Sequence, residues 1–408
     1  MNAELSYKNN TSDISITIPG SKSESNRLLI LQALYPNIKI ENCSNSDDTL
    51  NLIKGLGQIK GTLDVGHAGT AMRFLTAYFA SRKGTDIIIT GSDRMKERPI
   101  KILVDALVDL GAEIQYLNKP GFPPLKIHGK DLKHSSISLN TDISSQYISA
   151  LLLIAPTLSN GIKLSLEGGI TSKPYIEMTL DILDELGISS IFSENKIEII
   201  SAKKIKDKIF NVESDWSSAS YFYSIVALSK NIEIRLKNFS KNSLQGDSLL
   251  PTLFEPLGVK TYFNTSENTI TLKKSDLLVN KIDIDLNNTP DLAQTIAVTC
   301  FGLGLSCTLR GLKTLKIKET DRLLALKTEL EKLGAKVNIT RESIEVSPSE
   351  GVKANQLIET YQDHRMAMAF APLALITPLG IINPNVVSKS YSTFWKDLEK
   401  VGIALHIK

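Results

Sequence analysis

Cysteine, aromatic residues and an excess of charge of either sign are all scarce in this sequence of 408 residues. The three cysteines, Cys43, Cys300 and Cys307, are an odd number, and none stands in a Cys-x-x-Cys pair. This usage excludes a disulfide framework and a thiolate zinc site. It is typical of a protein of the reducing cytoplasm, and a cytoplasmic location is therefore expected.

The charges nearly balance, because 47 lysines and arginines face 44 aspartates and glutamates, for a formal net charge of +3. A nearly neutral chain has no basic field to hold nucleic acid, and its few aromatic residues do not alternate with cations as in a stacking platform. The apolar runs are shorter than the roughly 20 residues that span a bilayer, and the start MNAELSYKNN has no basic segment before an apolar one. We therefore expect no nucleic-acid partner, no membrane insertion and no secretion.

What the sequence does contain is an irregular repeat. Six times an amphipathic helical pattern runs into Leu-Gly or Val-Gly and then into a β-rich segment, with the glycine at position 57, 111, 187, 258, 334 or 402. Glycine ends helices there because it enters the left-handed conformation without strain. Segments such as KVNITRESIEV and KTYFNTSENTITL have a polar turn between two alternating runs, which predicts β-hairpins. The chain is thus expected to form six units rich in β and α elements.

A second, more apolar helix is predicted once per unit. Its starts read GSKSESNR, GHAGTAMR, SSQYISA, SDWSSAS, NTPDLAQ and YQDHRMA, and each offers Ser, Thr or Asp as an N-cap. Capping alone explains any single start. Several helix N-termini that converge would instead form an anion site, and five of the starts also carry polar or ionisable side chains, namely Lys22, Arg27, Arg73, Gln146, Asp291, His364 and Arg365.

Four further segments mix cations with carboxylates or small residues close to these helices. Surface ion pairing is the ordinary meaning of such runs. The alternative is a cluster that fixes a charged small molecule, with Lys22 and Arg27 neutralising a phosphate held by a small-residue loop that lacks the Walker spacing. The segments are RMKERPI from residue 94, KIKETDR from residue 316, YQDHR from residue 361 and SKS from residue 388.

These segments resemble the motifs of the 5-enolpyruvylshikimate-3-phosphate synthase family, in the family's order from residue 19 to residue 395. The resemblance rests on PGSKSESNR, GHAGTAMR, RMKERPI, SSQY, TSKPYIE, TPDLAQTIA, KIKETDRL, DHRMAMAF and VVSKSYSTFW. It implies an α/β (α+β) fold, a two-domain inside-out α/β barrel of six βαβαββ units with the active site in the interdomain cleft. It also implies that residues 19–212 form one domain of three units, and residues 1–18 with 213–408 form the other.

The resemblance implies an enzyme that transfers the enolpyruvyl group of phosphoenolpyruvate to the 5-hydroxyl of shikimate 3-phosphate and releases phosphate. This is a step of the shikimate pathway to chorismate and the aromatic amino acids. The partners implied are the two small-molecule substrates, with no cofactor, no metal and a monomeric protein. Two polyanions must be brought together, the hydroxyl must lose a proton, and the methylene carbon must gain one before the tetrahedral adduct collapses.

The family's roles pass to this sequence by motif. Catalytic roles are implied for Lys22, Asp291 and Glu319, with Asp291 as the base at the hydroxyl and Glu319 as the proton carrier at the methylene carbon. Shikimate 3-phosphate would be bound by Lys22, Ser23, Arg27, Ser144, Ser145, Gln146, Ser172, Tyr175, Asp291, Thr314 and Lys318. Phosphoenolpyruvate would be bound by Lys22, Gly69, Arg98, Gln146, Arg322, Arg365 and Lys389.

Three positions depart from the commonest motifs: His67 and Thr314 stand where Asn is usual, and Phe74 where Pro is usual. Phe74 lies in the predicted helix that carries Gly69, and it could shift that glycine. Gly69 is next to the space that glyphosate occupies in the family, so sensitivity to glyphosate stays open. One alternative is the sister enzyme that uses UDP-N-acetylglucosamine, although the segment KPGFPPLKIHG lacks the cysteine expected there. The other is a non-catalytic anion-binding protein of the same fold.

Overall fold

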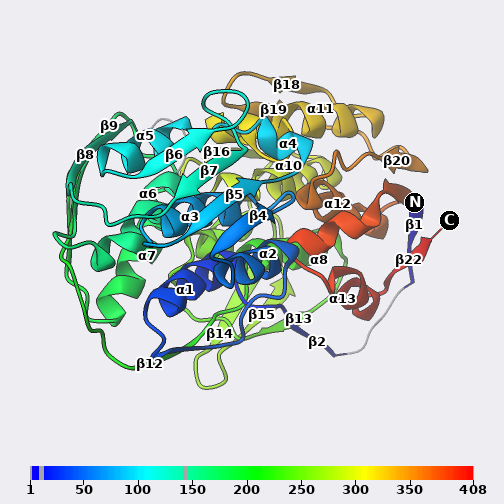
Figure 1. Ribbon diagram of the computed structural model, residues 1–408. Helices are drawn as coiled ribbons and strands as arrows, with labels where there is room; N and C mark the ends of the chain where they lie inside the picture. The colour runs from blue at the N-terminus through cyan, green and yellow to red at the C-terminus, as the bar shows by residue number, and fades with distance from the viewer. Residues whose placement is uncertain (1, 9–12, 141–144, 408) are drawn as a thin grey trace. The chain divides into compact units, whose positions relative to one another are not determined.

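A computed structural model describes residues 2–8, 13–140 and 145–407 of the chain. The chain divides into two compact units (Figure 1). Residues Gly20–Val212 form one of them, which we call the middle unit. Residues Met1–Pro19 and Glu213–Lys408 form the other, the terminal unit. The chain therefore starts in the terminal unit, completes the middle unit, and returns.

The described part of the middle unit has three sheets. Two of them join a parallel pair to an antiparallel hairpin, and the third is a parallel pair alone. The first sheet has the order β4 (Lys60–Asp64), β5 (Asp86–Thr90), β7 (Leu125–His128), β6 (Glu113–Tyr116). The second has the order β10 (Ser190–Ser193), β11 (Lys196–Ile199), β9 (Ile162–Glu167), β8 (Ser136–Asn140). The third pairs β3 (Ile38–Glu41) with β12 (Lys208–Asn211).

Some helices of the middle unit are buried almost throughout, and others have one exposed face. The helices are α1 (Lys22–Leu34), α2 (Asp47–Leu56), α3 (Gly69–Ala80), α4 (Asp93–Lys96), α5 (Lys101–Asp109), α6 (Ser145–Ile154) and α7 (Lys173–Glu185). Helices α1, α3 and α6 contact one another, α7 contacts α1 and α6, and all 12 residues of α3 are buried. The strands β5, β7 and β9 alternate buried residues with half-buried or exposed ones, as sheets with one solvated face do. Helices inside and sheets outside are the predicted inside-out layering.

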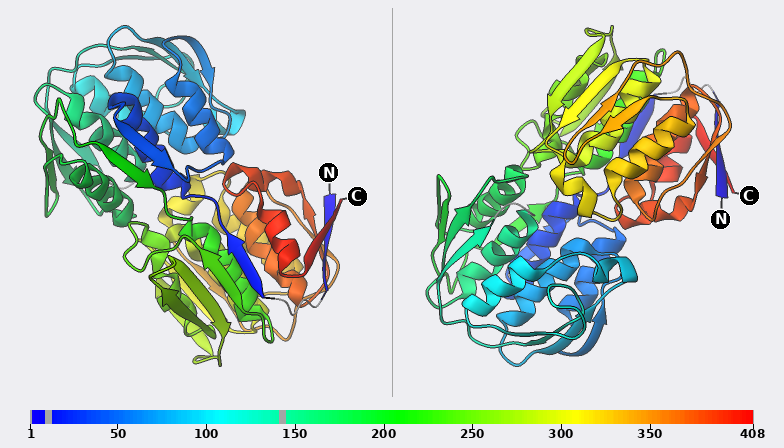
Figure 2. Two further views of the ribbon diagram at one scale, coloured as in Figure 1. Left: turned by 90° about the horizontal axis from the view of Figure 1, so that it is seen from below. Right: turned by 90° about the horizontal axis from the view of Figure 1, so that it is seen from above.

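The terminal unit repeats this plan with three four-stranded sheets. Their orders are β20 (Gln356–Ile358), β21 (Leu379–Ile382), β1 (Asn2–Tyr7), β22 (Ile403–Ile407); then β14 (Val259–Asn264), β15 (Thr269–Lys274), β13 (Ile234–Lys237), β2 (Ile14–Thr17); then β16 (Lys281–Asp285), β17 (Ser306–Arg310), β19 (Ile344–Val346), β18 (Val337–Ile339). Strands from the two ends of the chain, β1 and β22, lie side by side (Figure 2).

The α-helices of the terminal unit are α8 (Trp216–Leu228), α9 (Leu250–Phe254), α10 (Ala293–Gly302), α11 (Arg322–Lys332), α12 (His364–Phe370) and α13 (Phe394–Lys400). Short 3-10 helices precede or follow several of them, including η2 (Gly246–Leu249), η3 (Pro290–Leu292), η4 (Lys313–Ile317) and η6 (Pro384–Lys389). Helices α8, α10 and α12 contact one another or their short extensions and are buried almost throughout. No helix in the described ranges is long and apolar enough to cross a membrane.

The predicted repeat is largely present. Both hairpins form, β18 with β19 and β14 with β15. Five of the six predicted helix-ending glycines have a positive φ, whereas Gly57 has φ −78° and continues in the right-handed conformation. Within the described residues, the repeat that contains α1 and α2 has only the two-stranded sheet β12–β3. This repeat is therefore a reduced copy of the four-stranded plan.

The predicted helix caps are correct at three starts and wrong at two. Ser21, Asp215 and Asp363 each accept a hydrogen bond from a backbone N–H of the helix that follows. Helix α3 instead starts after Ala68 with no side-chain cap, because glycine and two arginine side chains occupy that end. Before α10, Thr289 precedes the 3-10 turn η3 and makes no side-chain capping bond. The cap of α6 lies outside the described residues.

Candidate functional site

Lys22 is the first residue of α1, and it pairs with a carboxylate from the next helix. Its Nζ lies 3.2 Å from Oδ2 of Asp48, in α2, and the Asp48 side chain is almost fully buried. Ser21 holds the start of α1 by accepting a hydrogen bond from the backbone N–H of Glu24. The pair leaves the ammonium of Lys22 partly exposed, with donors to spare for an anion.

Arg27 is buried one turn further along α1, where it joins three helices. Its Nε donates to Oγ1 of Thr179, and its Nη2 donates to Oγ of Ser149 and to the carbonyl of Tyr175. Its Nη1 donates to the carbonyl of Ser23. A guanidinium has five N–H groups, so these four bonds leave one N–H for a ligand. Burial lowers the pKa of Arg27 to about 10, partly offset by Tyr175 and Glu24, and the side chain stays charged at neutral pH.

Gly69 begins α3 in the space between two guanidinium groups. A Cβ at this position would lie 2.6 Å from Nη1 of Arg98 and 3.0 Å from Nη1 of Arg73. Arg73 donates from Nη1 to the Gly69 carbonyl at 2.9 Å, and Arg98 is buried at the end of the RMKERPI segment. Only glycine fits here without moving Arg98, so the structure brings the predicted Gly69 and Arg98 together.

The starts of α6 and α7 supply the remaining predicted residues of the middle unit. Gln146 in α6 donates from Nε2 to Oγ1 of Thr70 in α3 at 3.5 Å, beside the buried Ser145. Ser172 caps α7 with a left-handed backbone, φ 55°, a conformation that costs a serine about 1–3 kcal/mol and clusters at functional sites. Tyr175 lies against the Arg27 guanidinium at 5.9 Å. Ser144, also predicted, lies outside the described residues.

In the terminal unit, one arginine binds three carboxylates. Arg322, the first residue of α11, is 2% exposed at its side chain. Its Nε lies 2.6 Å from Oδ2 of Asp363, its Nη1 2.8 Å from Oδ1 of Asp291, and its Nη2 2.8 Å from Oε2 of Glu319. Burial lowers the pKa of Arg322, but the three carboxylates raise it well above its usual range. Arg322 is therefore a permanent cation in the middle of the cluster.

Asp291, in η3, has two further cationic partners. Its Oδ1 lies 3.4 Å from Nζ of Lys318, and its Oδ2 lies 3.1 Å from Nη2 of Arg365 at the start of α12. Burial alone would raise the pKa of Asp291, but Arg365, Lys318 and Arg322 together lower it well below its usual range. Burial lowers the pKa of Lys318, which its carboxylate neighbours partly restore. Asp291 is therefore ionised, which a general base requires, and it forms ion pairs with three cations.

Glu319 bridges Arg322 and the last cation of the predicted set. Its Oε1 accepts from Nζ of Lys389, at the end of η6, at 2.7 Å. Asp291, Lys318, Glu319, Arg322, Arg365 and Lys389 therefore form one connected cluster. Thr314 in η4 makes none of these contacts, and its buried Oγ1 has no hydrogen-bond partner among the described residues.

Three buried carboxylates bind or electrostatically influence residues of these clusters, although the sequence interpretation did not assign them a role. Asp48 and Asp363 hold predicted cations, as described above. Asp247, in η2, is buried and accepts a short hydrogen bond from Ser217 at the start of α8. Burial, followed by the charge of Asp291, raises the pKa of Asp247 to about 7. The segment around Asp247 has no motif, so only the tertiary structure identifies it.

The family-specific departures have distinct environments. His67 is exposed, with Nδ1 3.0 Å from Oγ of Ser92. Phe74 is buried in α3 and lies against the guanidinium of Arg27 at 5.6 Å, on which Tyr175 also stacks. Phe74 therefore packs on a predicted substrate-binding arginine.

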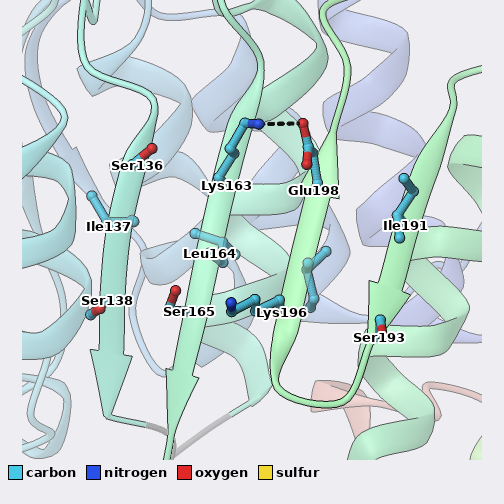
Figure 3. A pocket seen from close by; sticks show the side chains of 11 residues that line it. Ser136, Ile137, Ser138, Lys163, Leu164, Ser165, Ile191, Ser193, Lys196 and Glu198 are labelled. Atoms are coloured by element: carbon cyan, nitrogen blue, oxygen red, sulfur yellow. Dashed lines mark ion pairs between the residues drawn. The ribbon is translucent and has the colours of Figure 1, made fainter.

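A hollow on the outer face of the β10–β11–β9–β8 sheet contains none of the predicted residues (Figure 3). Serine side chains line it, together with the surface ion pair of Lys163 with Glu198 at 2.8 Å. Exposed ion pairs of this kind contribute little to stability. The cationic clusters described above are the better candidates for a functional site. Among the described residues there is no group of three or more His, Cys, Asp or Glu side chains that could hold a metal ion.

Comparisons with known proteins agree with one another. The model of the family described as EPSP synthase (3-phosphoshikimate 1-carboxyvinyltransferase) matches residues 58–398. A 3-phosphoshikimate 1-carboxyvinyltransferase of Bacteroides fragilis is 47% identical over 396 residues, which cover 96% of each chain. One of Haemophilus influenzae is 38% identical over 422 aligned positions, covering 95% of this chain and 96% of that one. The solved structure of EPSP synthase from Acinetobacter baumannii has a TM-score of 0.76 at 20% identity over the whole of both chains, a likeness of fold.

Proposed function

We infer that this chain, which belongs to the EPSP synthase (3-phosphoshikimate 1-carboxyvinyltransferase) family, is an enzyme that transfers the enolpyruvyl group of phosphoenolpyruvate to shikimate 3-phosphate. The acceptor is the 5-hydroxyl, and the products are 5-enolpyruvylshikimate 3-phosphate and phosphate. The matched relatives carry this activity in their names and are aligned along nearly the whole chain. The reaction belongs to aromatic amino-acid biosynthesis.

The observation that best supports this function is the cluster around Arg322. In this cluster, four cations contact two carboxylates whose side chains are slightly exposed. The cations are Lys318, Arg322, Arg365 and Lys389, and the carboxylates are Asp291 and Glu319. Phosphate and carboxylate groups of a substrate suit arginine forks and lysine ammonium groups. Two carboxylates among those cations also provide the two proton-transfer groups that the reaction needs.

We propose that phosphoenolpyruvate takes over partners now held by the protein's own carboxylates. Its phosphate and carboxylate would bind Arg322, Arg365 and Lys389, with Lys22, Gly69, Arg98 and Gln146 as further ligands. Shikimate 3-phosphate would be bound by Lys22, Ser23, Arg27, Ser144, Ser145, Gln146, Ser172, Tyr175, Asp291, Thr314 and Lys318. The single N–H that Arg27 keeps supports a one-point contact from that residue.

The same exchange of partners would prepare the acid and the base. In the ligand-free protein, Arg365, Lys318 and Arg322 lower the pKa of Asp291, so its carboxylate is a weak base. A substrate anion that claims those cations removes this stabilisation and moves the pKa of Asp291 upward. Glu319 would acquire a proton more readily for the same reason, since Arg322 and Lys389 are its partners. Binding of the anionic substrate therefore promotes both proton transfers.

Asp291 takes the proton of the 5-hydroxyl while the hydroxyl oxygen attacks C2 of phosphoenolpyruvate. Glu319 gives a proton to the methylene carbon, which becomes a methyl group. In the tetrahedral adduct, a methyl proton returns to Glu319, the C2–C3 double bond re-forms, and the C2–O bond to phosphate breaks. The proton on Asp291 leaves with the released phosphate or to solvent. Lys22 would stabilise the negative charge on the transferred groups.

We further propose that the protein acts as a monomer in the cytoplasm, on small-molecule substrates. The cysteine usage supports the cytoplasmic location. The two units support the proposed domain boundaries, residues 19–212 for one domain and 1–18 with 213–408 for the other, to within one residue. Nothing in the comparisons supports UDP-N-acetylglucosamine as the acceptor.

A phosphate-release assay tests the proposed function. Purified protein is incubated with phosphoenolpyruvate and either shikimate 3-phosphate or UDP-N-acetylglucosamine, without added metal. Release with shikimate 3-phosphate alone is expected. Release with UDP-N-acetylglucosamine would assign the sister activity, and binding of both substrates without release would assign a non-catalytic protein.

A further inference from the structure

Two consecutive residues with a left-handed backbone stand directly before the start of α12. Tyr361 has φ 53° and Gln362 has φ 58°, and neither is glycine. Such a conformation costs a non-glycine residue about 1–3 kcal/mol and persists only where its surroundings hold it. The next residue is Asp363, which binds Arg322 and caps α12. A strained turn thus leads directly into the cationic cluster.

A buried carboxylate of α11 holds this turn. Glu329 is 0% exposed, and its Oε1 accepts from the hydroxyl of Tyr361 at 2.6 Å. Its Oε2 accepts from Nζ of Lys332 at 2.7 Å and from the backbone N–H of Glu359 at 3.1 Å. A carboxylate buried this deeply requires such partners. Three donors therefore tie Glu329 to its own helix and to the segment that enters the turn.

Glu359 adds a second support from within the segment. Its Oε1 accepts from the backbone N–H groups of Thr360 and Tyr361, at 3.0 and 3.2 Å. Burial and the hydrogen bond to Glu329 raise the pKa of Tyr361, which keeps its hydroxyl protonated and able to donate. The turn is therefore held at both its backbone and its side chain.

Helix α11 contacts this segment at two levels. Arg322 and Glu329 are seven residues apart, about two turns, and so lie on the same side of the helix. Glu329 binds the segment at Tyr361, and Arg322 binds it at Asp363. The strained pair Tyr361–Gln362 is therefore attached at its first residue and directly after its second. Its geometry is thereby fixed relative to α11.

We propose that Glu329 and Tyr361 are positioning residues, which hold the strained turn so that Arg322 and Arg365 keep the geometry that binds phosphoenolpyruvate. The inference rests on the proposed function. Release of Tyr361 lets the turn relax toward an ordinary backbone, and Asp363 moves with it. Asp363 sets the guanidinium of Arg322 and the first turn of α12, which carries Arg365. The two arginines that face the donor substrate are therefore displaced together.

Tyr361→Phe tests this directly, since it removes only the hydroxyl that donates to Glu329. The KM for phosphoenolpyruvate should rise about tenfold, which corresponds to ~1.4 kcal/mol. The KM for shikimate 3-phosphate should change by less than about threefold, because most of its proposed ligands are in the middle unit. Hydrogen exchange of the backbone amides of residues 359–365 should speed up in this variant. In the Tyr361→Phe background, Gln362→Asn should restore part of the affinity, because asparagine enters the left-handed region more readily.

Tyr223→Phe is the matched control. The Tyr223 hydroxyl is buried in the same unit and bonds Oγ1 of Thr261 at 2.9 Å, apart from the cluster. This variant should lose stability without any change in either KM or in exchange at residues 359–365. Glu329→Gln is the second variant, and it decides the matter if Tyr361→Phe does not fold. It replaces one of the two acceptor oxygens by an NH2 donor, so the side chain can no longer accept all three hydrogen bonds that hold the segment, and it should raise the KM for phosphoenolpyruvate in the same direction.

A folded Tyr361→Phe protein with the wild-type KM for phosphoenolpyruvate would overturn the proposal, whatever its melting temperature. Equal effects on both substrates, with no rescue by Gln362→Asn, would assign the pair a general structural role and also overturn it. The proposed function is judged separately, on the wild-type protein. If the wild type releases no phosphate, the link to phosphoenolpyruvate fails together with the proposed function. Hydrogen exchange of the backbone amides of residues 359–365 still reports whether Tyr361 and Glu329 hold the turn.

Discussion

Arg322 Nε lies 2.6 Å from Oδ2 of Asp363, and both side chains are buried although the residues are 41 positions apart in the chain. Asp363 also accepts the backbone N–H of Arg365 at 2.9 Å, which caps α12. One carboxylate thus binds the guanidinium of Arg322, the first residue of α11, and the backbone of Arg365 in the first turn of α12. The placement of Arg365 and Arg322 in the cluster depends on the same side chain.

Asp363→Asn should therefore damage the binding of phosphoenolpyruvate more than folding. The amide keeps an oxygen to cap α12 but loses the charge that orients Arg322. A hydrogen bond to a charged group contributes about 1.5–3 kcal/mol, so kcat/KM for phosphoenolpyruvate should fall roughly 10- to 100-fold. Steady-state kinetics with shikimate 3-phosphate at saturation measure the effect.

Asp397→Asn provides the control for that variant. Asp397 is also a buried carboxylate of the terminal unit, where it accepts from Tyr391, Thr393 and Lys400. The variant should lower the melting temperature and leave kcat/KM unchanged. Equal losses of activity in both variants would contradict a specific role for Asp363.

Glu319→Gln should abolish most of the turnover while substrates still bind. The amide has nearly the shape of the carboxylate but cannot carry the proton to the methylene carbon. Loss of a general acid–base group lowers kcat by about 10²- to 10⁴-fold. Rapid-quench measurement of phosphate release, together with titration of shikimate 3-phosphate, separates chemistry from binding. A kcat near the wild-type value would remove Glu319 from the mechanism.

Gly69→Ala should raise the KM for phosphoenolpyruvate. The new methyl group would lie 2.6 Å from Nη1 of Arg98, so this guanidinium must move from its position. Gly57→Ala is the matched control, because Gly57 has φ −78° and its Cβ would meet only the carbonyl of Lys54, at 3.7 Å. The control should keep the wild-type KM. An unchanged KM in Gly69→Ala would disprove the contact between Arg98 and the substrate.

Asp247 should make stability depend on pH in the acid-to-neutral range. Burial and the negative charges of Asp291 and Asp215 raise the pKa of Asp247 to about 7, although the Ser217 hydroxyl and Arg365 oppose this rise. An unfolded aspartate has a pKa of about 3.9. The folded protein thus holds a proton that the unfolded chain releases, and its free energy of unfolding falls as the pH rises from about 4 to about 7.

Asp247→Asn removes this titration. The difference in unfolding free energy, variant minus wild type, should increase as the pH rises from about 4 to about 7 and stay level above it. Urea unfolding at several pH values measures the difference. A difference that does not vary with pH would mean that Asp247 titrates like an ordinary aspartate.

Local signals explain why the helices and hairpins could be predicted. Ser21, Asp215 and Asp363 cap helices through bonds within three residues, and Gly334 ends α11 through its own backbone. These hydrogen bonds join residues that are close in sequence, so the local sequence is sufficient to predict them. The start of α3 was mispredicted because its environment is set by arginine side chains, one of them from a segment 29 residues later.

The partners of the cations could not be predicted in the same way. Lys22 pairs with Asp48 and Arg322 with Asp363 across 26 and 41 positions, and the packing of helices brings each pair together. Asp247 and Glu329 were assigned no role from the sequence, and only the structure shows that both carboxylates are buried and which groups donate to them. The motifs identified the cations of the two clusters, whereas the tertiary structure identified the carboxylates that bind them.

The most direct test of the central claim is the product itself. Proton and phosphorus nuclear magnetic resonance can follow phosphoenolpyruvate and shikimate 3-phosphate mixed with the purified protein. We expect equal amounts of free phosphate and of a vinyl ether on the 5-oxygen of shikimate 3-phosphate to form. If phosphate appears without the vinyl ether, or if neither appears while both substrates bind, the protein does not transfer the enolpyruvyl group.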